Sequence, residues 1–505
     1  MPRHPFRSAL IVALCATSAA CMAEVKPNGL FVDNCVLQRG VQVPIWGTAD
    51  SGERVTVEFQ GQSVSTMPED GRWRVLLKPL KTGGPNTLTI KGSNSIEIKN
   101  VLVGEVWLCG GQSNMQWAIF QSDEPEKHIA SAQDSLLRLV TVPRNATDAP
   151  LTTVNVQWKE AIGENIRDFS AVAYHFGKRL REHLKVPVGL ISSNYGGTPA
   201  EAWMRREALE QVPELRGILA EYQKQVDAFP AQLKAHEDAV SKARAEGKQP
   251  PAPPRDPKTN PQRPTGLYNA MIAPLSPYAI RGAIWYQGES NAGRAYQYRT
   301  LFPEMIYNWR RAMGNRDFPF LFVQLAPFMA INPEPMDSAW AELREAQLLT
   351  TKEVPYAAMA VITDVGHETD IHPKQKEPVG ERLALAARAL AYGDSVKWSG
   401  PEFDAMKVEN GRAILRFRPR GGSLETPNGE ELKGFTIAGE DRKFVNAKAK
   451  IEGNTVVVWS ETVIHPAAVR YGWANYPVVN LRNKEGLWAS PFRTDTWPGI
   501  TQPKP

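Results

Sequence analysis

After residue 100, short apolar runs alternate with helix-forming segments, and this pattern constrains the fold most. Between two of the runs, apolar residues recur every four positions from Val172 to Leu184, as on one face of a helix. Strand–helix alternation is typical of a parallel sheet covered by helices on both faces. We therefore expect a three-layer α/β/α fold over residues 101–398. The apolar runs are Val101–Leu108, Val186–Ser192, Ile280–Tyr286, Phe318–Leu325 and Ala357–Ile362.

The segments on either side of this region have the period-two pattern of β-strands. Apolar and polar residues alternate from Val55 to Phe59, and β-type alternation returns from Ile414 to Phe417. A chain of 505 residues also exceeds what one hydrophobic core usually holds. We expect a β-sandwich-like domain over residues 24–100 and a second small β-domain over residues 399–505.

The helix–strand rhythm is interrupted at about residues 205–265. Residues 218–247 are charged and helix-forming, and residues 249–264 are rich in proline. This composition predicts an inserted helix followed by an extended segment over the surface.

The first residues have the features of a secretory signal. Arg3 and Arg7 precede the short apolar run Ala9–Ala16, and small residues follow. The run is too short to span a bilayer, so we expect a signal peptide over residues 1–23, export to the periplasm or the medium, and no membrane span. Lipidation of Cys21 is the alternative that we rank lower.

Charge and cysteine content exclude several functions. The formal charge is +5 with no basic run, so no nucleic-acid partner is expected. Cys35 and Cys109 are the two cysteines that remain after the expected signal, too few for a disulfide scaffold or a zinc cluster. We expect Cys109 to be a buried structural thiol and the protein to hold no metal.

Two glycine-rich turns follow predicted strands, where α/β enzymes carry their active sites. The first, Gly110–Met115, would project Ser113 into solvent as a nucleophile beside backbone N–H groups. The second, Asn194–Thr198, contains Gly196 and Gly197, whose backbone N–H groups can bind an anion. Each turn taken alone is common on protein surfaces.

A histidine follows the last predicted strand. His372 lies in Asp370-Ile371-His372-Pro373, and a serine nucleophile needs such a base with a carboxylate that orients it. The competing base is His367, which has Asp364 nearby in the sequence.

Together these segments resemble the sialate O-acetylesterase family, a branch of the SGNH hydrolases. The similarity runs in order from about residue 28 to 495, so the resemblance implies the SGNH-hydrolase form of the α/β fold. The matching blocks are residues 104–115, 194–203, 285–291, 370–374 and 469–477.

The resemblance implies Ser113 as the nucleophile and His372 as the base, with no metal or organic cofactor. The oxyanion hole would consist of the Ser113 backbone N–H and a Gly196 or Gly197 N–H. A polar side chain from the block Gln287–Asn291 should complete it.

Two features depart from the SGNH pattern. The oxyanion side chain could be Gln287 or Asn291, and we favour Gln287. The position three residues before the base, where the acid is usual, holds Thr369. The orienting group could therefore be Asp370, Asp364 or a backbone carbonyl, and Asp370 is our assignment.

The implied function is a serine esterase that removes O-acetyl groups from a carbohydrate, with O-acetylated sialic acid as the first candidate substrate. An esterase acting on acetylated xylan or pectin and a non-catalytic glycan-binding protein are the alternatives. Tryptophans could stack on sugar or belong to the core, and an arginine could bind the sialate carboxylate. These candidates are Trp117, Trp203, Trp285, Arg205, Arg206, Arg294 and Arg344.

Overall fold

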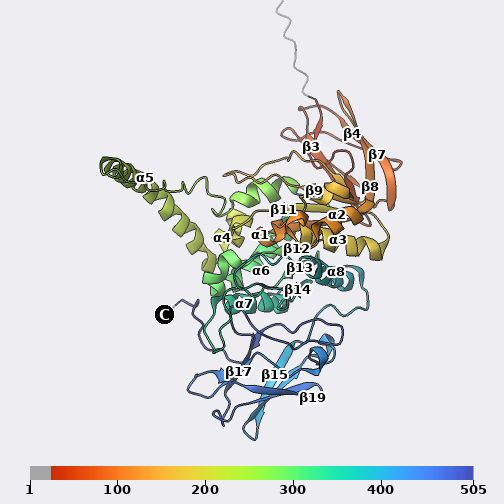
Figure 1. The fold of residues 1–505 in the computed structure, drawn as a ribbon. Coiled ribbons are helices and arrows are strands. Elements are labelled where there is room, and N and C mark those ends of the chain that lie inside the picture. Colours follow the sequence, from red (N-terminus) through yellow and green to blue (C-terminus); the bar gives the residue numbers. More distant parts are fainter. Residues whose placement is uncertain (1–23, 504–505) are drawn as a thin grey trace, which may run out of the picture.

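The computed structural model describes residues 24–503 and consists of a central α/β body between two groups of β-strands (Figure 1). The N-terminal strands lie at one end, the C-terminal sheets lie at the other, and α5 (Arg216–Ala245) projects from the side. The expected signal at residues 1–23, with Cys21, lies outside the described residues.

The central sheet has the strand order β10-β9-β11-β8-β12-β13-β14, in which all strands except the antiparallel edge strand β10 run parallel. Each predicted apolar run forms one of these strands. Because β8 pairs with both β11 and β12, their carboxyl ends meet at the middle of the sheet. The strands are β8 (Ser95–Gly111), β9 (Gln133–Thr141), β10 (Lys159–Ile162), β11 (Val188–Asn194), β12 (Gly282–Tyr286), β13 (Phe320–Val323) and β14 (Ala357–Ala360).

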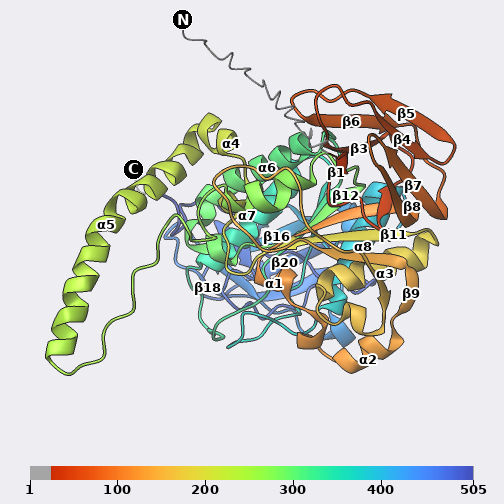
Figure 2. The ribbon, with the colours of Figure 1, turned by 90° about the horizontal axis from the view of Figure 1, so that it is seen from above.

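Helices cover both faces of this sheet, which confirms the three-layer α/β prediction (Figure 2). On one face, Trp107 of β8 packs edge-on against Phe176 of α3, with 5.0 Å between ring centroids. On the other, Trp309 and Phe302 of α6 contact Trp285 of β12 and Phe322 of β13, and α7 packs against β14. The main helices are α3 (Ala171–Leu184), α6 (Ala295–Ala312), α7 (Ala339–Glu353) and α8 (Glu377–Tyr392).

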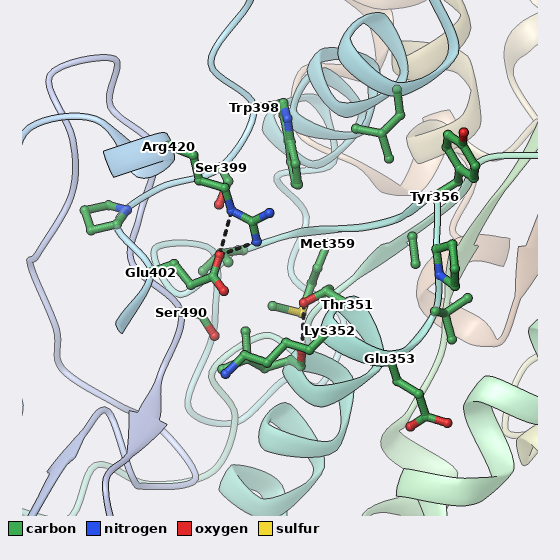
Figure 3. A pocket seen from close by; sticks show the side chains of 17 residues that line it. Thr351, Lys352, Glu353, Tyr356, Met359, Trp398, Ser399, Glu402, Arg420 and Ser490 are labelled. Carbon is green, nitrogen blue, oxygen red and sulfur yellow. Dashed lines mark hydrogen bonds and ion pairs between the residues drawn. The ribbon is translucent and has the colours of Figure 1, made fainter. Parts of the chain in front are cut away.

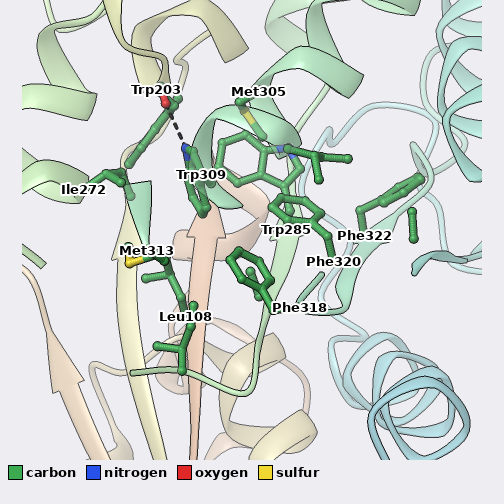
Figure 4. Close-up of a cluster of buried hydrophobic side chains, with 14 of the residues drawn as sticks. Leu108, Trp203, Ile272, Trp285, Met305, Trp309, Met313, Phe318, Phe320 and Phe322 are labelled. Carbon is green, nitrogen blue, oxygen red and sulfur yellow. Dashed lines mark hydrogen bonds between the residues drawn. The ribbon is translucent and has the colours of Figure 1, made fainter. Parts of the chain in front are cut away.

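Aromatic side chains fill the core beneath α6 (Figure 4). Trp285 of β12 lies between Trp203 and Trp309, at centroid distances of 5.8 and 5.3 Å with nearly perpendicular rings. The indole N–H of Trp309 donates to the Trp203 carbonyl at 2.9 Å. All three side chains are fully buried, so Trp203 and Trp285 are core residues rather than sugar platforms.

Strand β8 continues from the N-terminal strands into the central sheet, so the boundary expected at residue 100 falls inside one strand. Its first half pairs with β7 and β2, and its second half pairs with β11 and β12. A cavity of about 1000 Å³ separates Trp46 and Trp73 from residues 150–153 of the body. The N-terminal strands are β1 (Lys26–Pro27), β2 (Val36–Gln38), β3 (Val43–Thr48), β4 (Val55–Phe59), β5 (Gln62–Thr66), β6 (Arg72–Leu77) and β7 (Gly83–Lys91).

The C-terminal region forms two four-stranded antiparallel sheets. It meets the body beside β14, where a cavity of about 350 Å³ is lined by Tyr356, Trp398 and the ion pair Glu402–Arg420 (Figure 3). The strands are β15 (Phe403–Glu409), β16 (Arg412–Phe417), β17 (Phe435–Ala438), β18 (Val445–Asn446), β19 (Lys448–Glu452), β20 (Thr455–Trp459), β21 (Ala468–Tyr471) and β22 (Phe492–Arg493).

The insertion forms an arm. Helix α5 leaves the body after α4 (Arg206–Gln211), and residues 246–265 return beside it without regular secondary structure (Figure 2). Only Ile218 of α5 is buried, so the helix is supported mainly at its base.

Two further expectations concern membranes and thiols. Within residues 24–503, no helix is long and apolar enough to cross a membrane.

Cys35 and Cys109 are both free and buried, and burial raises the pKa of each thiol. Cys109 is thus inert as a nucleophile and packs in the core, as predicted.

Candidate active site

A tight turn joins β8 to the short helix α1 (Ser113–Gln116). Gly111 has φ +147°, and a Cβ atom there would lie 2.2 Å from the Tyr286 carbonyl oxygen, so the turn requires glycine. Ser113 begins α1, and its backbone N–H therefore has no acceptor within the helix. Ser113 thus lies at the carboxyl end of the sheet, at the point where β8 is flanked by β11 and β12.

Three polar side chains of this turn each bind a different neighbouring segment. Gln112 Oε1 accepts from the Gly288 and Ser290 N–H groups at 3.4 and 3.3 Å. Gln116 Oε1 accepts from the Gly196 N–H at 2.8 Å. Asn114 donates to the carbonyl of Ile371, beside His372, at 3.0 Å. The Ser113 hydroxyl, in contrast, forms no hydrogen bond among the described residues.

Asn114 is the centre of a buried polar network. Its Nδ2 donates to Glu289 Oε1 at 2.7 Å, and its Oδ1 accepts from Lys376 Nζ at 2.5 Å. Burial raises the pKa of Glu289 and lowers the pKa of Lys376 to about 7. Lys376 Nζ also lies 5.7 Å from the Trp117 ring centroid and 5.5 Å from that of Tyr286. This network links the serine turn, the segment after β12 and the histidine loop.

His372 lies over α1. Its ring stacks on Trp117 with 4.8 Å between centroids and 15° between planes, and the Trp117 backbone N–H donates to the Ser113 carbonyl at 2.9 Å. Nδ1 lies 3.5 Å from Asp370 Oδ1, which also accepts from the His372 backbone N–H at 2.8 Å. Burial and then the Lys376 charge lower the pKa of His372, and Asp370 raises it.

Asp364, the alternative acid, and His367, the alternative base, have other partners. Asp364 forms two hydrogen bonds of 2.6 Å with the Arg382 guanidinium. His367 is exposed, and its Nδ1 accepts from the backbone N–H groups of Thr369 and Asp370, each at 3.2 Å. Of the acids weighed from the sequence, Asp370 is thus the one that lies beside the His372 ring.

The Asn194–Thr198 turn contacts the serine turn directly. A Cβ atom on Gly196 would lie 3.3 Å from the Ser113 Cβ, so a side chain there would crowd the serine. Gly197 has φ +70° and is exposed, and its carbonyl accepts from Gln262 Nε2 of the arm at 2.7 Å. In the structure the Gly196 N–H is occupied by Gln116.

Gln287 and Asn291 lie beneath these turns and are buried. Gln287 Nε2 donates to Asn291 Oδ1 at 2.6 Å and to the Thr198 carbonyl at 3.3 Å, and its Oε1 accepts from the Tyr298 hydroxyl at 2.9 Å. Asn291 donates to Glu201 at 3.0 Å and accepts from the Ala200 N–H at 2.9 Å. Both N–H bonds of Gln287 are thus used within the protein.

The arginines proposed for a sialate carboxylate are all engaged. Arg344 is fully buried and donates to four backbone carbonyls. Arg205 and Arg206 form surface ion pairs with Glu207 and Glu210. Arg294 is paired with Glu201 at 2.5 Å.

One group of side chains in residues 24–503 could share an ion. The ligand atoms of His128, His175 and Glu377 lie within 4.8 Å of one another. Glu377 also lies 3.5 Å from the Arg179 guanidinium, and burial beside His128 lowers the pKa of His175 to about 3. The Arg179 guanidinium also pairs with Glu381 and Glu182, so Glu377 is one of three carboxylates around it.

Comparison with known proteins identifies the family of this chain. A family model described as a carbohydrate esterase, sialic acid-specific acetylesterase, matches residues 258–389, which include Gln287 and His372. The sialate O-acetylesterase of Rattus norvegicus is 32% identical over 412 residues, 74% of each chain. The chain belongs to the sialate O-acetylesterase family. The human family member is 32% identical over 398 residues, which cover 71% of this chain and 69% of that protein.

A solved structure is similar over nearly the whole chain. A carbohydrate acetylesterase from Xanthomonas citri superposes with a TM-score of 0.82 and 38% sequence identity. The match covers 94% of this chain and all of the other. The similarity to that protein therefore includes the flanking β-regions as well as the α/β body.

The sequence reasoning missed the polar residues that hold the site together. Asn114 stands inside the matching serine block, Gln116 follows this block directly, and Lys376 follows His372 by four residues. No local signal marks Lys376, because the neighbouring residues Lys374, Gln375 and Glu377 are polar as well. Spacing alone could not identify Glu289 as the partner of Asn114, because 175 residues separate them.

Proposed function

We propose that the protein is a serine esterase that removes O-acetyl groups from a carbohydrate, with Ser113 as nucleophile and His372 as base. The observation that carries the proposal is the hydrogen bonding of the serine turn. Every polar side chain of Gln112–Gln116 is tied to a neighbouring segment except that of Ser113, which is left free.

In this mechanism Ser113 Oγ attacks the acetyl carbonyl while His372 Nε2 accepts its proton. The orientation of Nδ1 toward Asp370 leaves Nε2 for the serine, and Asp370 stabilises the imidazolium. His372 then protonates the departing sugar oxygen. Water, activated by the same imidazole, hydrolyses the acetyl-enzyme and releases acetate.

For the oxyanion hole we propose backbone donors, namely the Ser113 and Gly196 N–H groups. The Gly196 N–H already binds a carbonyl-type oxygen, Gln116 Oε1, which the substrate oxygen would replace. Gln287, the favoured donor from the sequence, and Asn291, its rival, instead support the Thr198–Glu201 segment through their hydrogen bonds.

The family relationship favours O-acetylated sialic acid as substrate. A second candidate is a neutral acetylated polysaccharide such as acetylxylan. It is favoured because each of the four arginines considered for binding the sialate carboxylate is already paired or buried. We also propose that the protein is exported, with residues 1–23 as its signal.

Replacement of Ser113 tests the proposal. Ser113→Ala should lower kcat for p-nitrophenyl acetate by on the order of 10⁶, since it removes the nucleophile. Acetate release from O-acetylated sialic acid and from acetylxylan, measured with both proteins, then identifies the substrate. A folded Ser113→Ala protein with activity within about tenfold of the wild type would exclude Ser113 and leave a glycan-binding protein as the alternative.

A further inference from the structure

A polar cavity of about 500 Å³ lies between the arm and the body. One wall is the base of α5, from Gly217 to Gln225, and another is the returning segment from Pro257 to Pro264. The third consists of Ser290, Arg294 and Gln297, which follow β12. The inserted arm thus encloses a space that the α/β body alone would leave open.

This cavity adjoins the serine turn. Gln262, in its wall, donates to the Gly197 carbonyl at 2.7 Å, and Gly196 lies against Ser113. Ser290, in the opposite wall, donates its N–H to Gln112 Oε1 at 3.3 Å. A group that extends from an ester held at Ser113 past Gly197 would therefore enter this cavity.

The charged groups of the cavity neutralise one another. Arg294 is paired with Glu201 at 2.5 Å, and Arg263 lies 3.3 Å from Asp148. Glu221 is paired with Lys224 at 3.6 Å. Beyond these pairs, the lining contains the Tyr222 ring and the side-chain amides of Gln225, Asn260 and Gln297. Asn260 Oδ1 and Gln297 Oε1 already accept from the Gln262 backbone N–H and from Arg294, so these two amides offer their N–H groups.

We infer that this cavity binds an uncharged sugar residue joined to the acetylated one, so that the substrate is an oligosaccharide or polysaccharide. The inference rests on the proposed esterase function. A pocket of this volume is within the range of ligand sites, roughly 300–1,000 Å³. Side-chain amides hydrogen bond to hydroxyl groups, and a tyrosine ring contacts the apolar face of a sugar while its hydroxyl remains polar. A charged ligand would find no unpaired countercharge among the lining ion pairs.

Tyr222→Ala tests the inference, with Phe229→Ala as its matched control. Both are half-buried aromatic residues of α5, but Phe229 lies farther along the arm and does not line the cavity. The substrates are acetylated xylotetraose with acetylated xylose, and O-acetylated sialyllactose with O-acetylated sialic acid. The pair that the wild type hydrolyses is used, and p-nitrophenyl acetate serves as a reference ester.

The wild type should prefer the oligosaccharide over its monosaccharide by about tenfold or more in kcat/KM, mainly through KM. Tyr222→Ala should abolish this preference and leave p-nitrophenyl acetate turnover within about twofold. Phe229→Ala should retain the preference. Gln225→Ala, at an exposed position, should weaken it by about threefold as a second variant.

Equal kcat/KM for the long and short substrates, or a preference that survives Tyr222→Ala and Gln225→Ala, would overturn the subsite. Loss of activity on every ester in a folded Tyr222→Ala protein would also overturn it, because the residue would then act on the site as a whole. Failure of the esterase proposal is seen separately, as p-nitrophenyl acetate turnover that persists in Ser113→Ala.

Discussion

An aromatic ring and a carboxylate position the His372 imidazole. Trp117 stacks on its face, and Asp370 lies beside its Nδ1. His367, five residues earlier, instead accepts hydrogen bonds from its own loop. The two histidines are close in sequence, but only one is positioned by a ring and a carboxylate.

His372→Ala should therefore lower kcat by on the order of 10⁶, as loss of the base does in serine hydrolases. His367→Ala, the control, should lower it by no more than about threefold, because it removes only a loop contact. Steady-state kinetics with p-nitrophenyl acetate measures both. If the larger loss occurred in His367→Ala, the base would have to be reassigned.

Lys376 should set the acid limb of the pH–rate profile. As the proposed base, His372 accepts a proton only when it is neutral, so activity should fall as the pH drops through the His372 pKa. That pKa is lowered below 6.5 by burial and by the Lys376 charge. Lys376→Met removes the charge, so the His372 pKa should rise and the acid limb of kcat/KM should move to higher pH.

The control for this experiment is Lys374→Met, which changes an exposed lysine of the same loop. It should leave the profile in place, since Lys374 is not among the groups that shift the His372 pKa. If the acid limb of kcat/KM stayed at the same pH in Lys376→Met while kcat remained normal, the Lys376 ammonium would have no influence on the pKa of His372.

Gln287 should prove a stabilising residue. Removal of its amide leaves the Tyr298 hydroxyl and the Thr198 carbonyl without a partner in a buried place, at about 1–3 kcal/mol for each. Gln287→Ala should thus lower the Tm, and Tyr298→Phe should reproduce part of that loss with little change in kcat. A normal Tm with kcat reduced about 10²–10³-fold would restore Gln287 as an oxyanion donor.

Among the elements, the arm is the one with least support from the body. Residues 246–256 have no regular secondary structure and are mostly exposed. Limited trypsin digestion should therefore cut first near Lys248 and Arg255, and mass spectrometry of the fragments identifies the sites. A first cut within the central strands would contradict the arrangement of the arm.

The strands and helices of the body could be predicted because burial on both faces makes each parallel strand a continuous apolar run. The prediction at Val186–Ser192 lies within two residues of β11, and the helical face at Val172–Leu184 coincides with α3. Strand β9 was missed because Arg138 interrupts its apolar run. That side chain is buried through contacts with the Ser135 carbonyl and Glu160, which no local pattern reveals.

The site could be predicted only in part. Ser113, Gly196 and Gln287 each follow a strand, and the sequence order of the strands suggests that these ends meet. Which amide can donate to the developing oxyanion depends on hydrogen bonds between residues far apart, such as Gln287 with Thr198. The assignment of Gln287 as oxyanion donor rested on its place in the chain and could not include these contacts.

At the scale of the whole molecule, the α/β body is joined in one way to the C-terminal sheets and in another way to the N-terminal strands. The C-terminal sheets meet it at the edge beside β14, with a cavity between them. The N-terminal strands share β8 with it, and Phe31 stacks on Tyr278 at 5.4 Å. Asn28 also donates to the Pro274 carbonyl at 2.9 Å, so side chains reinforce the shared strand.

Because β8 belongs to both, the strands β2, β4, β5 and β7 form one continuous sheet with the body. Any rotation of these strands against the body would have to break the ladder that β8 forms with β7 or with β11. The sheet β1-β3-β6, which carries Trp46 at the cavity, lies outside this ladder, so its position depends on side-chain contacts such as that of Trp46 with Tyr278.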